Sequence, residues 1–332
     1  MDFEKIDELL IGEPVYRIKQ IRKVLYKDLI ENWSEATTLP LALREKLNAQ
    51  TPLGINAQIF ESEDKRTIKA LIFLKDGIKI ESVLMRHKND RNTVCVSSQA
   101  GCPLGCAFCA TGKLGFKRNL GKFEIAEQVL FFGRYLKKIG QKVTNVVFMG
   151  MGEPFLNYDN ALGAIDFLND PEGFGLGARN FSISTSGIIE GIRRLSQERM
   201  EINLAVSLHS PNQEIRSKIM PVNRNYPIGK VLEAVKEYAA LRKRKVMFEY
   251  TLMDGVNDSN KDARELARLM KNPLYFVNLI SCNPVPGFKP SSAERTKKFK
   301  EILEAENVKV TVRYRFGQDI DAACGQLAGR EV

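Results

Sequence analysis

The chain has 332 residues, a formal net charge of +10 at pH 7 and a pI of about 9.2. Its 44% hydrophobic and 27% charged residues are the balance of a globular protein with a sizeable core. It contains no run of about 18 apolar residues and no signal-peptide pattern, so we expect a cytoplasmic protein that does not enter a membrane. The positive charge favours a polyanionic partner, most simply a nucleic acid; a merely basic surface is the alternative.

Residues 1–52 are predicted to form a helical accessory domain. In residues 13–30, apolar side chains recur close to the 3.6-residue period of an α-helix, and residues 38–49 predict a further helix. The opposite face of the first of these helices is basic and carries Arg17, Lys19, Arg22 and Lys23. That face is either a solvated surface or a contact for RNA.

Residues 53–90 change character and are predicted to form a small β linker. Three segments alternate or run apolar, at 55–62, 67–75 and 79–85. Lys75-Asp76-Gly77 predicts a turn between the last two. We expect a small antiparallel sheet that joins the helical domain to the rest of the chain.

Strands and helices alternate through residues 91–332. Strands are predicted at 93–98, 142–150, 180–186, 202–208, 245–253, 274–281 and 308–316. Helices are predicted at 122–138, 158–168, 189–197, 227–244, 261–270 and 292–306. Repeated βα units imply an α/β domain with a parallel sheet covered by helices. We expect a partial (β/α)6 barrel, although the strand count alone does not separate it from a doubly wound sheet.

Three of the six cysteines form a C-x3-C-x2-C motif: Cys102, Cys106 and Cys109. This clustering indicates metal use in a reducing compartment rather than a disulfide scaffold. Structural zinc usually takes four ligands in two separated pairs, and no second CxxC is present. Three thiolates can instead hold a [4Fe–4S] cluster with one iron open, whereas an electron-transfer cluster takes four cysteines. The motif is typical of radical S-adenosylmethionine (SAM) enzymes, in which the open iron binds SAM.

Polar residues follow several predicted strands, where chemistry gathers in barrels of this kind. The stretch 150–154, GMGEP, fits a SAM-binding turn, with a plain strand–helix turn as the alternative. His209, at the end of another strand beside Ser207, fits a partner for the SAM ribose, although it could be a packed histidine. Ser184 and Asn283 are neutral and polar, and they suit ribose or carboxylate.

Two spare cysteines lie outside the motif. Cys95 precedes it by seven residues, and Cys324 lies in a near-terminal run of Ala, Gly and acidic residues. Each could be a fourth cluster ligand, a buried inert thiol, or part of a pair for covalent catalysis with a resolving partner. Cys282 is expected to be structural.

Six segments together resemble the RlmN/Cfr family of radical SAM RNA methyltransferases. In chain order they are CVSSQAGCPLGCAFCATG (95–112), FMGMGEP (148–154), SISTSG (182–187), SLHSP (207–211), VNLISCNP (277–284) and DIDAACGQLAG (319–329). PVYRIKQI (14–21) and the helices around it resemble the accessory domain of the family. The resemblance therefore spans most of the chain.

The resemblance implies methylation of adenosine 2503 in 23S rRNA, and for RlmN members also of adenosine 37 in tRNA; within the family the modified position is carbon 2 or carbon 8 of the adenine. It implies that the three motif cysteines bind the cluster, that Cys324 becomes S-methylated, that Cys95 resolves the intermediate and that Glu81 is the general base. It further implies SAM contacts from Gly152, Glu153, Ser184, Ser207, Leu208, His209 and Asn283. The Cfr type would methylate carbon 8 of the same rRNA adenine. GEP after FMGM and the segment 115–120 resemble the carbon-2 type, whereas SLHSP (207–211), the tail 313–324 and YRIKQI (16–21) lean toward the Cfr type. We expect carbon 2.

In such a reaction one SAM methylates Cys324, and a second yields a radical that activates this methyl group to add to adenine. Cys95 then attacks the Cys324 sulfur and leaves a disulfide, which an external reductant resets. We expect a monomer that uses a donor such as flavodoxin or ferredoxin. A radical SAM enzyme acting on a small metabolite would leave the basic helices and the tail motif unexplained. A non-catalytic RNA-binding protein would leave the cluster without a purpose.

Overall fold

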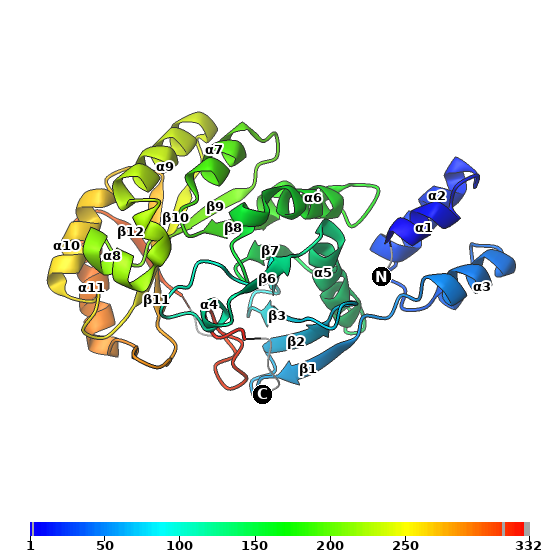
Figure 1. Ribbon diagram of the computed structural model, residues 1–332, viewed down its shortest axis with the longest axis horizontal. Coiled ribbons are helices and arrows are strands. Elements are labelled where there is room, and N and C mark those ends of the chain that lie inside the picture. Colours follow the sequence, from blue (N-terminus) through cyan, green and yellow to red (C-terminus); the bar gives the residue numbers. More distant parts are fainter. Residues whose placement is uncertain (2, 314–315, 329–332) are drawn as a thin grey trace.

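A computed structural model describes residues 1, 3–313 and 316–328 (Figure 1). Within these residues ten strands form one sheet, in the order β1-β2-β3-β4-β7-β8-β9-β10-β11-β12, and β5 and β6 pair separately. None of the described helices combines the length and the apolarity that a bilayer span requires.

The first part of the sheet is antiparallel, from β1 (Ala57–Glu61) through β2 (Thr67–Phe73) and β3 (Lys79–Arg86) to β4 (Asn92–Cys95). The predicted turn follows β2, and Gly77 has a φ of 79° there. The three linker strands are confirmed, but they do not form a sheet of their own. Because β3 pairs with β4, the linker continues directly into the main sheet.

Parallel pairing begins at β4 and continues to the far edge. The strands are β7 (Asn145–Phe148), β8 (Phe181–Thr185), β9 (Asn203–Ser207), β10 (Val246–Leu252), β11 (Tyr275–Ser281) and β12 (Lys309–Val312). Each lies within a predicted segment; Tyr314 and Arg315 of the last prediction lie outside the described residues. Spatial order follows chain order and never reverses, so the sheet is an open, singly wound barrel and not a doubly wound sheet.

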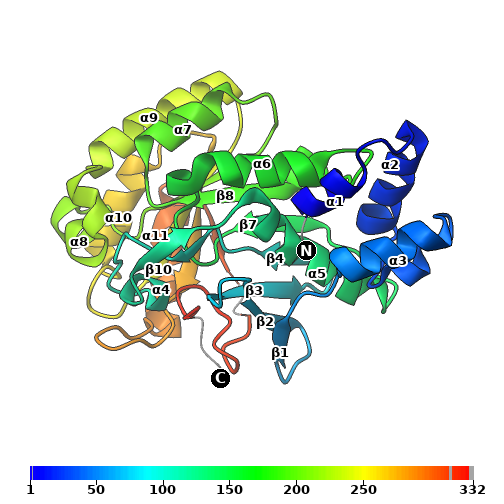
Figure 2. The same ribbon diagram turned by 45° about the vertical axis from the view of Figure 1, so that its right-hand side comes forward.

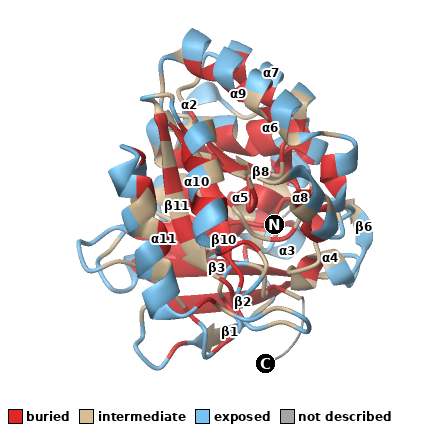
Figure 3. Cartoon of the chain, turned by 90° about the vertical axis from the view of Figure 1, so that its left-hand side faces the viewer, coloured by how far each residue is buried: buried red, intermediate tan, exposed pale blue. Residues whose placement is uncertain are grey.

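The predicted helices of the barrel are all present. They are α5 (Lys122–Lys137), α6 (Tyr158–Asn169), α7 (Ile189–Gln197), α9 (Ile228–Arg242), α10 (Asn260–Leu269) and α11 (Ala293–Ala305). In α5 the buried residues Ile125, Val129, Phe132 and Leu136 recur at helical spacing and face the sheet. Figure 3 shows the strands buried beneath helices whose outer faces are exposed.

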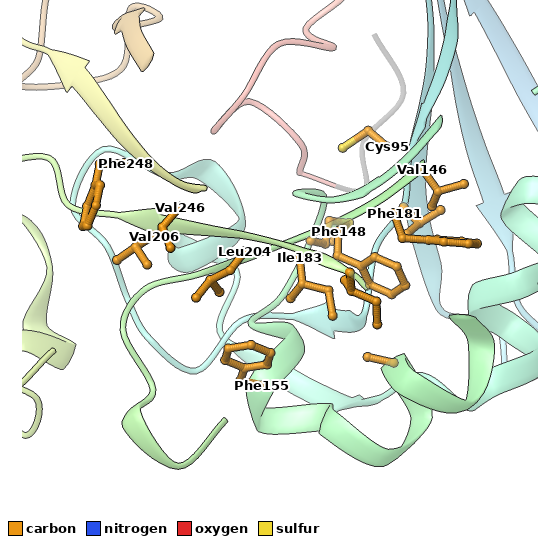
Figure 4. Packing of buried hydrophobic residues seen from close by; sticks show 14 of the residues in the cluster. Cys95, Val146, Phe148, Phe155, Phe181, Ile183, Leu204, Val206, Val246 and Phe248 are labelled. Atoms are coloured by element: carbon orange, nitrogen blue, oxygen red, sulfur yellow. The ribbon is translucent and has the colours of Figure 1, made fainter. Parts of the chain in front are cut away.

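The central strands alternate between two faces. Val146 and Phe148 of β7, Phe181 and Ile183 of β8, Leu204 and Val206 of β9, and Val246 and Phe248 of β10 form one packed apolar layer (Figure 4). Successive side chains of a strand point to opposite faces, so the residues between them face the other side. Ser184, Ser207 and Glu249, each directly after one of these apolar residues, lie on that other side and bring polar groups to the concave face of the barrel.

The N-terminal module has a core of its own, centred on Trp33, which is fully buried. Its elements are α1 (Phe3–Leu9), α2 (Val15–Arg22), a π-helical turn η1 (Lys23–Lys27), a 3₁₀ turn η2 (Trp33–Glu35) and α3 (Leu41–Gln50). The Phe3 ring of α1 stacks on Phe123 of α5 at 4.5 Å and meets Phe167 of α6 edge-on at 5.6 Å. Figure 2 shows α1 beside these two helices. The module thus packs on the outer helices; its exact boundaries with the linker stay a prediction.

Several short elements were not predicted. They are β5 (Gln99–Gly101), α4 (Ala110–Lys113), β6 (Phe116–Asn119), α8 (Gln213–Ile219) and the 3₁₀ turns η3 (Pro154–Asn157), η4 (Ala178–Asn180) and η5 (Pro221–Arg224). Each spans seven residues or fewer, too short to carry a clear hydrophobic period. Asn212 caps α8 by accepting hydrogen bonds from the Glu214 and Ile215 N–H groups.

Candidate active site

A cavity of about 160 Å³ that opens to solvent lies at the carboxyl ends of the parallel strands. Most of the residues predicted from the sequence line it: Cys102, Cys106, Cys109, Gly152, Glu153, Ser184, Ser207, His209, Asn283 and Cys324. Leu208 is fully buried and does not line the cavity; its N–H donates to the Glu249 carbonyl. The structure therefore brings the motifs of six chain segments to one place.

The loop with the three cysteines is fixed by tight backbone contacts. Gly101 has a φ of 80°, and a Cβ there would lie 1.9 Å from the Gly115 carbonyl oxygen. The Cys102 N–H donates to the same carbonyl at 2.9 Å. Only glycine allows this approach, which closes the β5–β6 hairpin around the loop.

The three thiols suit an iron–sulfur cluster as a donor set. Burial raises the pKa of Cys102 to about 12 and also raises that of Cys106, and the neighbouring thiolates raise both further. Three like charges this close need cations to balance them, which iron supplies. Among the described residues no group of three His, Cys, Asp or Glu side chains is arranged around a single ion. Thiolates on three corners of a cube need not converge on one ion, so the residues fit a cluster.

The GMGEP turn beside this loop is fixed by contacts of two of its own residues, Gly152 and Glu153. Gly152 has a φ of 101°, and a Cβ there would lie 2.5 Å from the Gln99 side chain. The Glu153 carboxylate accepts hydrogen bonds from the Phe155 N–H at 3.1 Å and the Ser186 N–H at 2.7 Å. Burial raises the pKa of Glu153, and these two bonds oppose the shift. Glu153 thus fixes the turn against the end of β8.

His209 is buried and neutral. Its Nδ1 accepts a hydrogen bond from the Thr251 N–H at 3.0 Å, which leaves the proton on Nε2. Burial and then the charge of Arg216 lower its pKa to about 3. The ring meets Phe108 of the cysteine loop edge-on at 4.9 Å. His209 can therefore act as a neutral hydrogen-bond donor in this cavity.

Arg216, on α8, is a buried charge that the sequence did not reveal. Its guanidinium donates to the carbonyls of Ser186 at 2.7 Å, Leu208 at 3.1 Å and Ser207 at 3.2 Å. It thereby joins the ends of β8 and β9 and fixes the spacing of the residues that line the cavity. Its signal in the sequence was weak, because a single arginine on a short helix usually faces solvent.

A second cavity adjoins the first and contains both spare cysteines. It is lined by Val83, Met85, Cys95, Met149, Ile280, Ser281, Asn283, Arg313, Phe316, Ala322, Ala323, Cys324 and Leu327. Cys324 lines both cavities. Cys95 ends β4 and is itself a buried member of the hydrophobic core (Figure 4). All six cysteines of the described chain are free, so the expected Cys95–Cys324 disulfide is not formed here.

The tail around Cys324 is anchored to two parts of the barrel. Gly325 and Leu327 accept hydrogen bonds from the Ala110 N–H at 2.7 Å and the Thr111 hydroxyl at 2.6 Å. Asn283 donates to the Cys324 carbonyl at 2.8 Å. The cysteine is therefore held between the cluster loop and the end of β11. Gly329 of the tail motif lies outside the described residues.

Glu81 lies on β3 beneath the tail. Its carboxylate pairs with Lys69 at 3.3 Å and accepts a hydrogen bond from the Ala328 N–H at 2.8 Å. Both side chains of the pair are buried. Glu81 is not among the residues that line either cavity. The structure therefore places the predicted base against the tail, and its catalytic role stays a prediction.

Comparisons with known proteins find relatives along nearly the whole chain. Residues 96–269 match the radical SAM superfamily. The chain is 47% identical to the probable dual-specificity RNA methyltransferase RlmN of Chloroflexus aurantiacus, over 96% of this chain and 88% of that protein. It is 44% identical to the protein of the same name from Symbiobacterium thermophilum, over 99% and 90%.

A crystal structure of a radical SAM methyltransferase from Sphaerobacter thermophilus superposes with a TM-score of 0.94 at 45% identity. The match covers 98% of this chain and 97% of that one, so it includes the accessory module and the linker as well as the barrel. The chain therefore belongs to the RlmN/Cfr family of radical SAM RNA methyltransferases.

Proposed function

We propose that the protein methylates carbon 2 of adenosine 2503 in 23S rRNA, and adenosine 37 of tRNA, through a methylated Cys324. The relatives named as dual-specificity RNA methyltransferases support an RNA substrate. The observation that carries the proposal is the position of Cys324, which lines both the cavity of the three cysteines and the cavity of Cys95. A methyl carrier has to face its donor on one side and its acceptor on the other.

The larger cavity is assigned to the cofactors. Cys102, Cys106 and Cys109 would hold the cluster, and the residues of the strand ends would bind SAM. When bound, these cofactors supply a methyl group and, by one-electron cleavage of SAM, a 5′-deoxyadenosyl radical. The protein positions Cys324 through its backbone contacts, and His209 offers a neutral donor to the ribose.

The smaller cavity is assigned to the target adenine. Its lining is mostly apolar, which suits a flipped base stacked between apolar side chains. After the carbon–carbon bond forms, the Cys95 thiolate attacks the Cys324 sulfur and frees the RNA. Glu81 remains our proposed base for the ring proton, and to reach it the carboxylate has to leave Lys69 and Ala328.

RNA would meet the basic face of the accessory module. Lys19, Arg22 and Lys23 are exposed, whereas Arg17 donates to Gln20 and to the Thr38 carbonyl. Arg17 therefore holds the module together, and the other three are the candidates for phosphate contacts, although Lys23 also pairs with Asp28 at 2.7 Å on the surface. We propose a monomer that acts in the cytoplasm and takes electrons from flavodoxin or ferredoxin.

The test uses protein loaded with its cluster under anaerobic conditions, SAM with a deuterated methyl group, and a 23S rRNA fragment. Mass spectrometry of the digested RNA should find 2-methyladenosine, resolved by chromatography from the 8-methyladenosine of the Cfr-type alternative. Release of 5′-deoxyadenosine should require the RNA. RNA-independent release, with no methylated nucleoside, would favour a small metabolite as substrate instead.

A further inference from the structure

Arg313 is the one charged side chain that lines the second cavity within the described part of the chain. Two thiols, Cys95 and Cys324, line the same cavity, and the other residues around it are apolar or neutral. Arg313 also lines the larger cavity. Arg313 is thus the single cation, among the described residues, at the junction of the two cavities. The apolar and neutral residues that line the second cavity do little to screen its charge.

Arg313 is held in place from β10 and β11. Its N–H donates to the Leu279 carbonyl at 2.9 Å, and its Nη1 lies 3.9 Å from Glu249 Oε2. Glu249 is only 3% exposed, and its Oε1 accepts a hydrogen bond from Asn278 at 3.1 Å. Among the described residues none donates a hydrogen bond to Oε2. The Glu249 carboxylate therefore balances the positive charge of the Arg313 guanidinium from 3.9 Å. It does not form the tight bidentate pair that would occupy the N–H donors of the guanidinium.

For Cys95 to react as a thiolate, a nearby cation has to offset the effect of burial on its ionisation. Burial raises the pKa of Cys95 to about 12, at which ~1 in 10⁵ of the thiol is ionised at pH 7. The charged groups that face it are Cys324 from the tail, which raises the pKa further, and Arg313, which lowers it. The residues that face it from β3 and from the end of β7, Val83, Met85 and Met149, are uncharged. During release Cys324 is a thioether without charge, so Arg313 and a hydrogen bond from the Met149 backbone are then the influences that lower the pKa of Cys95, and Arg313 is the larger of the two.

We propose that Arg313 is a positioning residue that favours the Cys95 thiolate in the release step, and that Glu249 keeps its guanidinium at the junction of the cavities. The inference rests on the proposed function of the two cysteines. In the step, the Cys95 thiolate attacks Cys324 sulfur, a sulfur–sulfur bond forms and the sulfur–methylene bond breaks. The electron pair passes to the methylene carbon, which takes a proton from solvent and becomes the methyl group. The two sulfurs are oxidised and the carbon is reduced.

The first test measures Cys95 itself and needs no RNA. In cluster-loaded protein with Cys324→Ala, the rate of Cys95 alkylation by iodoacetamide is followed by peptide mass spectrometry from pH 7 to 10. Because the thiolate is the reactive form, Arg313→Gln should slow alkylation about tenfold or more at each pH. Arg313→Lys keeps the charge and should stay within about threefold of the parent. Equal rates in the parent and Arg313→Gln would overturn the inference.

The second test measures release. With RNA, Arg313→Gln in the chain with Cys324 intact should accumulate a covalent protein–RNA adduct that resolves when the pH is raised. The adduct of Cys95→Ala should not resolve at any pH. An Arg313→Gln enzyme that turns over without adduct would also overturn the inference. If the alkylation rates fall as expected but the parent enzyme never methylates RNA, the proposed function fails while the effect of Arg313 on Cys95 stands.

Discussion

Asn283 donates a hydrogen bond to the backbone carbonyl of Cys324 at 2.8 Å, so a residue predicted to bind SAM also holds the predicted methyl acceptor. The side-chain oxygen of Asn283 accepts a hydrogen bond from the Gln318 side chain at 3.1 Å. One side chain thereby links the end of β11 to the tail. SAM binding and the position of Cys324 should consequently be coupled.

Replacing Asn283 with Ala should therefore reduce S-methylation of Cys324 severalfold, even when SAM is saturating. The physical reason is that the tail loses its anchor to β11, while the cluster cysteines keep theirs. Mass spectrometry of the Cys324 peptide measures the methyl occupancy, and iron analysis should find the cluster unchanged. Gln318→Ala is the matched control, because it removes the other partner of Asn283 and leaves the bond to Cys324. Full methylation in Asn283→Ala would contradict the coupling.

The cluster prediction concerns Cys102, Cys106 and Cys109. Replacing any one of them with Ala should cause a large loss of iron and of radical cleavage together, because a cube held by two thiolates is poorly retained. Iron and sulfide analysis of anaerobically prepared protein provides the measurement. Cys282→Ala is the control: Cys282 also lines the cavity, but it lies outside the motif and should leave the iron content intact. A full cluster in the triple variant would show that the assignment is wrong.

The basic face of the accessory module should bind RNA in a salt-dependent manner, because lysine and arginine contacts displace counterions from phosphates. Neutralising Lys19, Arg22 and Lys23 together should weaken binding and reduce the slope of log K against log salt by about 2. The control removes the same charge from the outer helices α9 and α10, by neutralising Lys230, Lys236 and Lys261. If the two triple variants lost the same affinity, only net charge would matter and this face would not be the site.

Gly152 offers a test of the GMGEP turn. Because its φ is 101° and a Cβ would meet the Gln99 side chain at 2.5 Å, Gly152→Ala should destabilise the fold by about 1–3 kcal/mol. SAM binding, measured by equilibrium dialysis, should fall with it. Gly229→Ala on α9 is the control, since a Cβ there meets nothing within 4 Å and alanine favours a helix. Denaturant midpoints that do not differ between the two variants would count against a strained turn.

Sequence patterns were sufficient for the framework of this fold. The apolar strands of the barrel and the periodic face of α5 were predicted because each repeats a physical signal over many residues. The separation of a partial barrel from a doubly wound sheet came only from the observed strand order. The β5–β6 hairpin and α8 were missed because both are short. Neither could be read from local periodicity.

The candidate site likewise contains residues that the sequence predicted and residues that it did not. The cysteine motif and the GMGEP turn were predicted because their spacing has a chemical reason. Arg216, Glu249 and Arg313 were missed, since each is a single charged residue whose burial depends on contacts far away in the chain. Glu81 was predicted from a resemblance, and only the structure shows its pair with Lys69 and its bond to the tail.

The roles of Cys95 and Cys324 lead to the last prediction. Cys324→Ala should abolish methylated RNA while the cluster and SAM binding remain, because the methyl group then has no acceptor. Cys95→Ala should still methylate Cys324 and add to adenine, because Cys95 acts only after the carbon–carbon bond forms. The reaction should stop there, with RNA attached to the protein through Cys324.

The adduct of Cys95→Ala should survive denaturation and appear as a slower band on a gel, sensitive to ribonuclease. Its yield should approach one per active protein, because each molecule can react once and has no thiol to resolve the link. The Cys95→Ala, Cys324→Ala double variant is the matched control and should form none, since it lacks the sulfur that carries the carbon. An adduct that persisted in the double variant would place the link elsewhere. Normal turnover by Cys95→Ala would mean that another group frees the RNA, and the close placement of the two cysteines around one cavity would need a different explanation.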